Sequence, residues 1–279
     1  RATAPTPPGE SPFRELPAAA GVFSNLFLAR ILLALLSAGP VWDDFTAWFS
    51  CEGTPGAPAE VLNAYSAKLK SRGLPPADID QRVAAVRKYL ADHPREALAL
   101  HFDRMYSWSA APFSRNPSAL VTKVASTRKP GKALDIAMGQ GRNAIWLAKA
   151  GWTVSGYDIS PEALRQAAQS ASAAGLSLDA KLASHDEYPL GESQWDLIVM
   201  SFAFTRLSDA DYMKRVHASL KPGGVLLVEG FNGGPRPGDP NMILKAFLDY
   251  RVLLFEDLPD LADWGNAKAP LLRMALEKR

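Results

Sequence analysis

The chain has 279 residues, of which 47% are hydrophobic and 22% are charged, and its formal net charge is +2. This length and composition are typical of a globular protein with one large domain, or one domain with a sizeable extension. The near-neutral charge and the scattered basic residues argue against a nucleic-acid partner. The single cysteine, Cys51, excludes an intramolecular disulfide and a cysteine-rich metal site, and we expect no bound metal.

The N-terminal stretch combines a polar and an apolar segment. Residues 1–20 are rich in Pro and Ala and are expected to be disordered or linker-like. Residues 22–36 are apolar but contain Asn25 and Arg30, and they are fewer than the ~20 that a membrane span needs. We therefore expect a packed helix and a cytoplasmic protein. Because the chain begins at Arg1 without methionine, an upstream targeting segment is left open.

Residues 21–115 have helical periodicity interrupted by Pro and Gly, with no alternating β pattern. The expected helices span 22–37, 41–50, 58–71, 76–91 and 94–107. This part of the chain is predicted to be an all-helical extension of a second domain, residues 116–279.

In that domain strands and helices alternate from Lys132 onwards, which predicts a doubly wound α/β sheet. The expected strands span 132–137, 153–157, 178–183, 195–202, 225–229, 251–256 and 270–277. The expected helices span 141–150, a segment between Ser160 and Gly175, and 209–220 with Ser208 in its capping box. Lys221-Pro-Gly-Gly is expected to be a turn into the fifth strand.

The turn after the first expected strand is the most informative feature. Asp135 lies within that strand, and Gly139 and Gly141 permit a tight turn and close approach of the backbone to a ligand. Asp158 ends the next strand, and parallel sheets bind ligands beyond the carboxyl ends of their strands. A carboxylate at that position can accept hydrogen bonds from both hydroxyls of a ribose. The pattern indicates a nucleoside that also carries a positive charge.

Together these motifs resemble the class I S-adenosylmethionine-dependent methyltransferases. The resemblance is carried by Asp135-x-Ala-x-Gly-x-Gly, by Asp158, by Trp195-Asp196-Leu-Ile-Val and by Lys221-Pro-Gly-Gly. Gly141-Arg142-Asn143 and Arg251-Val-Leu-Leu-Phe-Glu-Asp make it most similar to the tellurite-resistance-type branch, the methyltransferase domain 25-like proteins. The resemblance implies a Rossmann-like, seven-stranded sheet whose last strand is antiparallel, with S-adenosylmethionine as the cofactor.

The resemblance also implies which residues bind the cofactor. They are Asp135, Ala137, Gly139, Gly141, Asn143, Asp158, Ile159, Asp186, Met200 and Ser201. Asp135 would lie near the methionine amino group, Asp158 would hold the ribose hydroxyls and Ile159 would pack on the adenine. Asp186 is expected to meet the adenine amino group, with Ser184 as the alternative. Met200 and Ser201 would border the transferable methyl group.

Ala137 departs from the family pattern, which usually has a glycine at this position. We expect the alanine to be tolerated because its methyl group fits if the backbone angles there are ordinary.

Methyl transfer from a sulfonium depends mainly on positioning and desolvation, so no catalytic base is obligatory. Residues 101–108 would form a lid over the cofactor, as the resemblance implies. The candidates for a catalytic or acceptor-binding role are Tyr106, His185, Arg206 and Asn232.

Two other functions remain open at this stage. Gly139-x-Gly141-x-x-Ala144 also fits the fingerprint of an NAD(P)-dependent oxidoreductase. Ala137 leaves room for a non-catalytic sensor or scaffold that binds the cofactor. For an enzyme, the expected acceptor is a small molecule, and tellurite or another metalloid is suggested by the resemblance alone. The helical extension is expected to cover the pocket or to form a homodimer.

Overall fold

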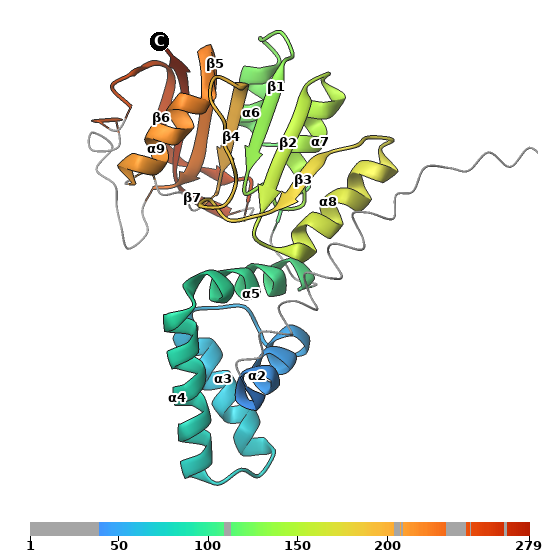
Figure 1. Cartoon of the computed structure of the whole chain (residues 1–279), viewed down its shortest axis with the longest axis vertical. Coiled ribbons are helices and arrows are strands. Elements are labelled where there is room, and N and C mark those ends of the chain that lie inside the picture. Colours follow the sequence, from blue (N-terminus) through green and yellow to red (C-terminus); the bar gives the residue numbers. More distant parts are fainter. Residues whose placement is uncertain are drawn as a thin grey trace, which may run out of the picture.

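The structure is a computed structural model that describes residues 39–108, 113–203, 207, 209–232, 244–245, 247–264 and 267–279. A helical unit, α2–α5, lies against one end of a sheet that is flanked by helices (Figure 1). The segment 1–20 and the expected helix 22–37 lie outside the described residues. Within those residues, no helix is both long and apolar enough to cross a membrane.

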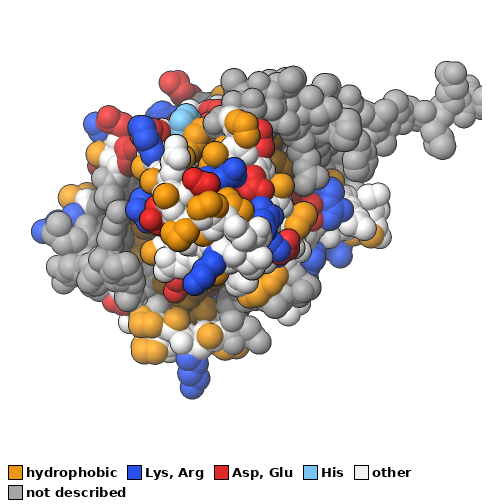
Figure 2. Space-filling view, turned by 90° about the horizontal axis from the view of Figure 1, so that it is seen from below, with side chains coloured by type: hydrophobic (Ala, Val, Ile, Leu, Met, Phe, Trp, Pro, Cys, Tyr) orange, Lys and Arg blue, Asp and Glu red, His pale blue; other side chains and the backbone are white. Residues whose placement is uncertain are grey.

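The helical unit contains α2 (Pro40–Cys51), α3 (Pro58–Ser71), α4 (Pro76–Asp92) and α5 (Pro94–Ser107). Each helix begins at a proline, whose fixed φ and missing N–H suit the first helical turn. Phe45, Trp48 and Tyr65 are among the buried residues of its core. Basic and acidic side chains are interspersed on the face shown in Figure 2, and ion pairs join Lys68 to Glu52 and other opposite charges in this unit.

The sheet has seven strands in the order β3-β2-β1-β4-β5-β7-β6. They are β1 (Lys132–Ile136), β2 (Thr153–Asp158), β3 (Asp179–Leu182), β4 (Trp195–Ser201), β5 (Leu220–Phe231), β6 (Tyr250–Ala262) and β7 (Ala267–Lys278). Strands β1–β5 pair in parallel, whereas β7 is antiparallel to both β5 and β6. The predicted seven-stranded fold with an antiparallel last strand is confirmed.

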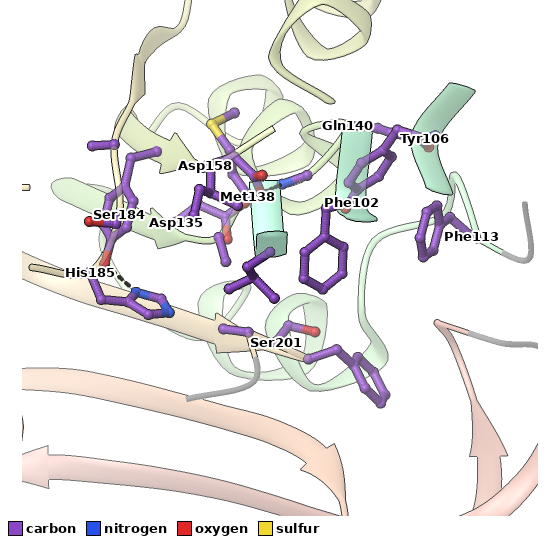
Figure 3. A pocket seen from close by; sticks show the side chains of 18 of the residues that line it. Phe102, Tyr106, Phe113, Asp135, Met138, Gln140, Asp158, Ser184, His185 and Ser201 are labelled. Atoms are coloured by element: carbon purple, nitrogen blue, oxygen red, sulfur yellow. Dashed lines mark hydrogen bonds between the residues drawn. The ribbon is translucent and has the colours of Figure 1, made fainter. Parts of the chain in front are cut away.

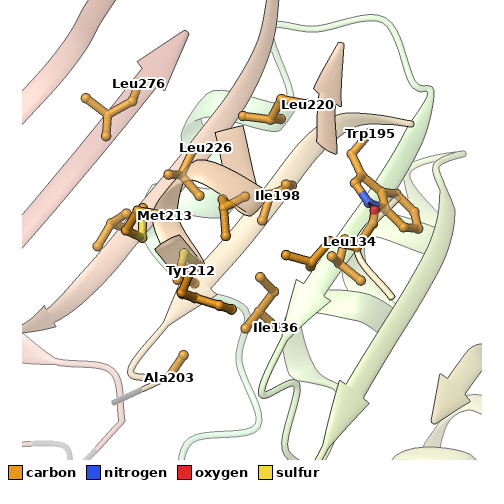
Figure 4. Packing of buried hydrophobic residues seen from close by; sticks show 14 of the residues in the cluster. Leu134, Ile136, Trp195, Ile198, Ala203, Tyr212, Met213, Leu220, Leu226 and Leu276 are labelled. Carbon is orange, nitrogen blue, oxygen red and sulfur yellow. Dashed lines mark hydrogen bonds between the residues drawn. The ribbon is translucent and has the colours of Figure 1, made fainter. Parts of the chain in front are cut away.

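Helices cover both faces of the sheet. They are α6 (Ala119–Ala125), α7 (Arg142–Lys149) and α8 (Pro161–Ala173) on one face, and α9 (Ala210–Ser219) on the other. In β4, Leu197 packs towards α7, whereas Ile198 packs with Leu134, Leu226 and Met213 on the α9 side (Figure 4). Complete burial of such a side chain contributes about 1.5–3 kcal/mol to folding. The alternation along β4 decides which residues at its end can face a ligand.

The C-terminal strands are longer than the sequence predicts. Lys221-Pro-Gly-Gly was expected to be a turn, but it belongs to β5, where the register shifts as Trp195 pairs with Leu220. Strands β6 and β7 pair with each other in antiparallel orientation, and this pairing continues up to Ala262 and Ala267 at the hairpin turn. Helix α9 is capped by Asp209, whose side chain accepts a hydrogen bond from the Tyr212 N–H, so the expected capping box was misplaced.

Candidate functional site

A cavity of about 390 Å³ lies at the carboxyl ends of β1, β2 and β4, and α5 lines it from the side of the helical unit (Figure 3). Its volume is within the usual range for small-molecule sites, roughly 300–1,000 Å³. The walls come from α5, the β1–α7 turn, the segment after β3, the end of β4 and the β6–β7 hairpin.

The β1–α7 turn lines the cavity with residues 137–140. Gly139 has a φ of +55°, and its N–H donates to Asp158 Oδ2 over 2.8 Å. A Cβ atom at Gly139 would overlap the hydroxyl of Tyr106. A side chain at this position would therefore displace Tyr106.

Asp135 is a buried carboxylate, 2% exposed, at the cavity wall. Its Oδ2 accepts a hydrogen bond from the Ala144 N–H over 3.1 Å. Burial raises the pKa of Asp135 to about 7, against the opposing effect of the nearby Arg142. A carboxylate that burial destabilises is a good partner for an ammonium group, so this position fits the amino group of a methionine.

Asp158 is also buried, with 5% exposure, and is held by backbone. One oxygen accepts from Gly139 N–H and the other from Ser160 N–H, over 2.8 and 2.9 Å. Burial raises the pKa of Asp158 to about 6, although these N–H groups lower it. Each carboxylate oxygen has a second lone pair, so the group can still accept from a pair of hydroxyls. These donors and acceptors fit a ribose.

The expectation for Ala137 was wrong in its premise. Its φ is +52°, in the left-handed region, because the chain must turn sharply between β1 and Gly139. An L-residue with a Cβ atom is strained in this region by roughly 1–2 kcal/mol. The alanine is accommodated in the turn, but not by ordinary backbone angles.

Helix α5 is tied to the sheet domain by hydrogen bonds. Asp103 Oδ1 accepts from the Ser160 hydroxyl over 3.0 Å and from the Glu162 N–H over 2.7 Å, both at the start of α8. The Gln166 side chain donates to the carbonyl of Tyr106 over 2.8 Å. These contacts hold Phe102 and Tyr106 against the cavity, where burial raises the pKa of Tyr106 well above its ordinary value.

His185 lies at the other end of the cavity from Tyr106 (Figure 3). Its Nδ1 is 2.9 Å from the Tyr157 hydroxyl, which is 3.1 Å from the hydroxyl of Tyr212. Ser184 and Asp186 also line this end, and Ser184 Oγ donates to Glu187 over 3.0 Å.

The cavity brings most of the predicted site residues together. Those that line it are Tyr106, Asp135, Ala137, Gly139, Asn143, Asp158, Ile159, His185, Asp186 and Ser201.

Gly141, Met200 and Asn232 are not among the lining residues. Gly141 is the N-cap of α7 with a left-handed φ of +77°, and a Cβ there would come within 3.1 Å of the Ala167 side chain, so it serves the turn and its packing. Met200 packs in the core on the α9 side. Asn232 donates to Asp257 over 2.6 Å, beyond the extended end of β5. Arg206 lies outside the described residues.

The structure also adds residues that the sequence did not single out. Arg142 lines the cavity and donates to Ser201 Oγ over 3.2 Å. Because it directly follows the glycine turn, the sequence could have identified it as a site residue. Phe113 and Trp264 line the cavity too, but they are far apart in the chain and no local motif marks them.

A buried ionic network lies behind the Ser201 wall. Glu229 accepts from Ser201 Oγ over 3.1 Å and from Ser118 Oγ over 2.6 Å. Arg273, on β7, donates to the other Glu229 oxygen over 2.8 Å. The last strand of the sheet thereby neutralises a carboxylate next to the cavity. Across the described part of the chain, no cluster of three or more His, Cys, Asp or Glu side chains could hold a metal ion.

Known proteins resemble this chain mainly in the sheet domain. Residues 133–224 match a family model described as a methyltransferase domain. An uncharacterised protein of Mycobacterium tuberculosis is 32% identical over 147 residues, which cover 49% of this chain and 50% of that protein. A ribosomal RNA small subunit methyltransferase C of Alcanivorax borkumensis is 34% identical over 104 residues, or 35% of this chain and 31% of that enzyme. The chain thus spans at most about half the length of these curated relatives.

Among solved structures, TehB from Haemophilus influenzae aligns with a TM-score of 0.51 at 18% identity, covering 65% of this chain and 67% of that one. At this identity the likeness concerns the fold, and it agrees with the Rossmann-like sheet described above.

Proposed function

We propose that this chain, whose residues 133–224 match a methyltransferase domain, is a class I S-adenosylmethionine-dependent methyltransferase that transfers a methyl group to a small-molecule acceptor. The observation that carries the proposal is the pair of buried carboxylates, Asp135 and Asp158, that line the same cavity as Gly139, whose N–H donates to Asp158. Together they offer partners for one ammonium group and two adjacent hydroxyls, which are the polar groups at the methionine and ribose ends of the cofactor.

Each residue then has a stated task. Asp135 pairs with the amino group, Asp158 accepts from the ribose hydroxyls and Ile159 packs against the adenine. Asp186 or Ser184 receives the adenine amino group at the His185 end of the cavity.

The bound cofactor supplies a methyl group on a positively charged sulfur, which is already activated for displacement. The protein therefore contributes positioning and exclusion of water. Phe102 and Tyr106 of α5 cover the cavity, and Asp103 fixes that helix to the start of α8. In this proposal the helical unit is a cover for the site, and its alternative use is as a dimerisation surface.

The small-molecule acceptor is supported by the enclosure of the cavity under α5 and by the mixed, paired charges of the helical unit (Figure 2). One relative is by its description a ribosomal RNA methyltransferase, so RNA belongs in the test as a competing acceptor.

A second candidate, cofactor binding without catalysis, is favoured by one observation, the strained Ala137 in the cofactor turn. Such a sensor would bind the demethylated cofactor tightly and would transfer no methyl group.

The test is calorimetric titration with S-adenosylhomocysteine and, separately, with NADH, followed by transfer of a labelled methyl group to a panel of small molecules and ribosomal RNA. We expect saturable binding of S-adenosylhomocysteine, none of NADH, and labelling of a small molecule. Absence of S-adenosylhomocysteine binding would overturn the cofactor assignment. Binding without any labelling would support the sensor, and labelling of RNA alone would refute the small-molecule acceptor.

A further inference from the structure

Four aromatic side chains form a continuous series at one end of the cavity. Tyr106 is in α5, Phe113 follows α5 in the chain, Trp264 is in the β6–β7 hairpin and Phe202 follows β4. The ring centroids are 4.5 Å apart for Tyr106 and Phe113, 5.1 Å for Phe113 and Trp264, and 6.1 Å for Trp264 and Phe202. All four line the cavity, and we call them the aromatic wall.

The aromatic wall lies away from the residues assigned to the adenine. In Figure 3, Tyr106 and Phe113 are on the opposite side of the cavity from Ser184 and His185. Ser201, which the family resemblance places beside the transferable methyl group, lines the cavity and directly precedes Phe202 of the wall. The wall therefore borders the space beyond the methyl group, where an acceptor must approach.

The charges around the cavity indicate what that acceptor is. Among the described lining residues, the carboxylates are Asp135, Asp158 and Asp186; the proposed function uses the first two for the cofactor, and Asp186 or Ser184 for its adenine. The basic side chains in the same set are Arg142 and Arg95. Arg142 donates to Ser201 and to the Asn116 carbonyl, and Arg95 pairs with Glu187. Arg142 lies near Tyr106 of the wall but is held by these two hydrogen bonds, so ring faces make up the wall itself and one cation lies at its edge.

We infer that the acceptor is an uncharged planar aromatic molecule that bears a nucleophilic hydroxyl or ring nitrogen; this inference rests on the proposed methyl transfer. Aromatic side chains attract aromatic ligands by offset and edge-to-face contacts, and they offer little to a metalloid oxyanion, whose hydration must be replaced by donors. The Phe113 and Trp264 rings are tilted at 49° to each other, so a planar ligand that lies parallel to one ring meets the other at an angle.

The reaction with a phenol balances without a further reactant. A lone pair of the phenol oxygen forms the new bond to the methyl carbon while the sulfur–carbon bond breaks. The sulfur keeps that electron pair and becomes the neutral thioether of S-adenosylhomocysteine, and the phenol proton leaves to solvent water.

The test measures binding first, so that it does not depend on turnover. Protein saturated with S-adenosylhomocysteine is titrated by calorimetry with naphthol and with para-cresol, each compared with its ring-saturated analogue, and with selenite. We expect each aromatic compound to bind about tenfold more tightly than its saturated analogue, and selenite not to bind saturably.

Leucine substitutions locate the binding. Trp264→Leu and Phe113→Leu keep an apolar side chain but remove the ring, so they should weaken naphthol binding about tenfold while S-adenosylhomocysteine affinity stays within about twofold. Phe231→Leu is the matched control, because Phe231 is an aromatic neighbour of Trp264 that does not line the cavity. We expect it to bind naphthol like the wild type.

Equal binding of aromatic and saturated compounds, or unchanged naphthol affinity in both wall variants, would overturn the inference while leaving the proposed function intact. Failure of the wild type to bind S-adenosylhomocysteine would instead overturn the proposed function, and this inference with it.

Discussion

The carboxylate of Asp103 in α5 accepts a hydrogen bond from the hydroxyl of Ser160, the N-cap residue of α8, over 3.0 Å. The N–H of the same serine donates to Asp158, the proposed ribose ligand. Ser160 thereby connects the helical unit to the proposed cofactor site. A substitution in α5 should therefore change the affinity for the cofactor.

This linkage predicts the effect of Asp103→Ala. The Glu162 N–H loses its acceptor and α5 loses a fixed point on the sheet domain, so we expect stability to fall by about 1 kcal/mol. The affinity for S-adenosylhomocysteine should fall about fivefold. Thermal unfolding and calorimetry measure the two effects. Asp103→Asn keeps an acceptor oxygen and should restore most of both; equal affinity in the alanine variant and the wild type would show that α5 does not support the site.

Asp158→Asn tests the proposed ribose contact. The amide preserves the size of the side chain but removes the charge that strengthens two hydrogen bonds to hydroxyls, so S-adenosylhomocysteine should bind about tenfold more weakly or worse. Calorimetry gives the dissociation constant. The control is Asp211→Asn, on the exposed side of α9, which should leave it unchanged. If Asp158→Asn and Asp211→Asn bind S-adenosylhomocysteine with the same affinity, the Asp158 carboxylate does not bind the ribose.

Ala137→Gly should stabilise the protein. Glycine relieves the strain of the left-handed backbone at this position but gains more freedom in the unfolded chain, so we expect a net gain of about 0.5–1 kcal/mol. Ala85→Gly, at an exposed position in the interior of α4, is the matched control and should destabilise by about 1 kcal/mol. Urea unfolding measures both. A loss of stability in Ala137→Gly would mean that packing of the alanine methyl group outweighs the strain.

The pH dependence of stability follows from Asp135. Its folded pKa, about 7, lies above the ordinary aspartate value, so between these two values the folded state binds more protons than the unfolded state. This residue's contribution to stability must therefore fall as pH rises from about 4 to 7. Subtracting the urea-unfolding free energies of Asp135→Asn from those of the cofactor-free wild type isolates that contribution. A difference that is flat with pH, or rises, would contradict the raised pKa.

The sequence could predict those features of the site that depend on residues close to one another in the chain. Asp135, Gly139 and Asp158 lie in or next to strands that short-range patterns identify, so their places at the cavity could be predicted. Met200 was assigned to the cavity together with Ser201, although consecutive strand residues face opposite sides of a sheet. The strand period alone could have corrected that assignment.

Other features depend on contacts between distant parts of the chain. Asn232 was a candidate for the site, but pairing with β7 extends β5 up to Phe231, and the asparagine that follows the strand bonds to Asp257 instead of lining the cavity. Phe113 and Trp264 meet at the cavity only because α5 packs on the sheet domain and the β6–β7 hairpin closes on that side. Such encounters are set by tertiary packing, which no short sequence window contains.

The β6–β7 hairpin supplies both Trp264 of the aromatic wall and Arg273, the partner of buried Glu229. It follows β5 and lies outside the segment that matches the family model, whereas Asp135 and Asp158, the carboxylates proposed to bind the cofactor, lie inside that segment. One side of the proposed acceptor space is therefore contributed by a part of the chain that the methyltransferase-domain match does not include.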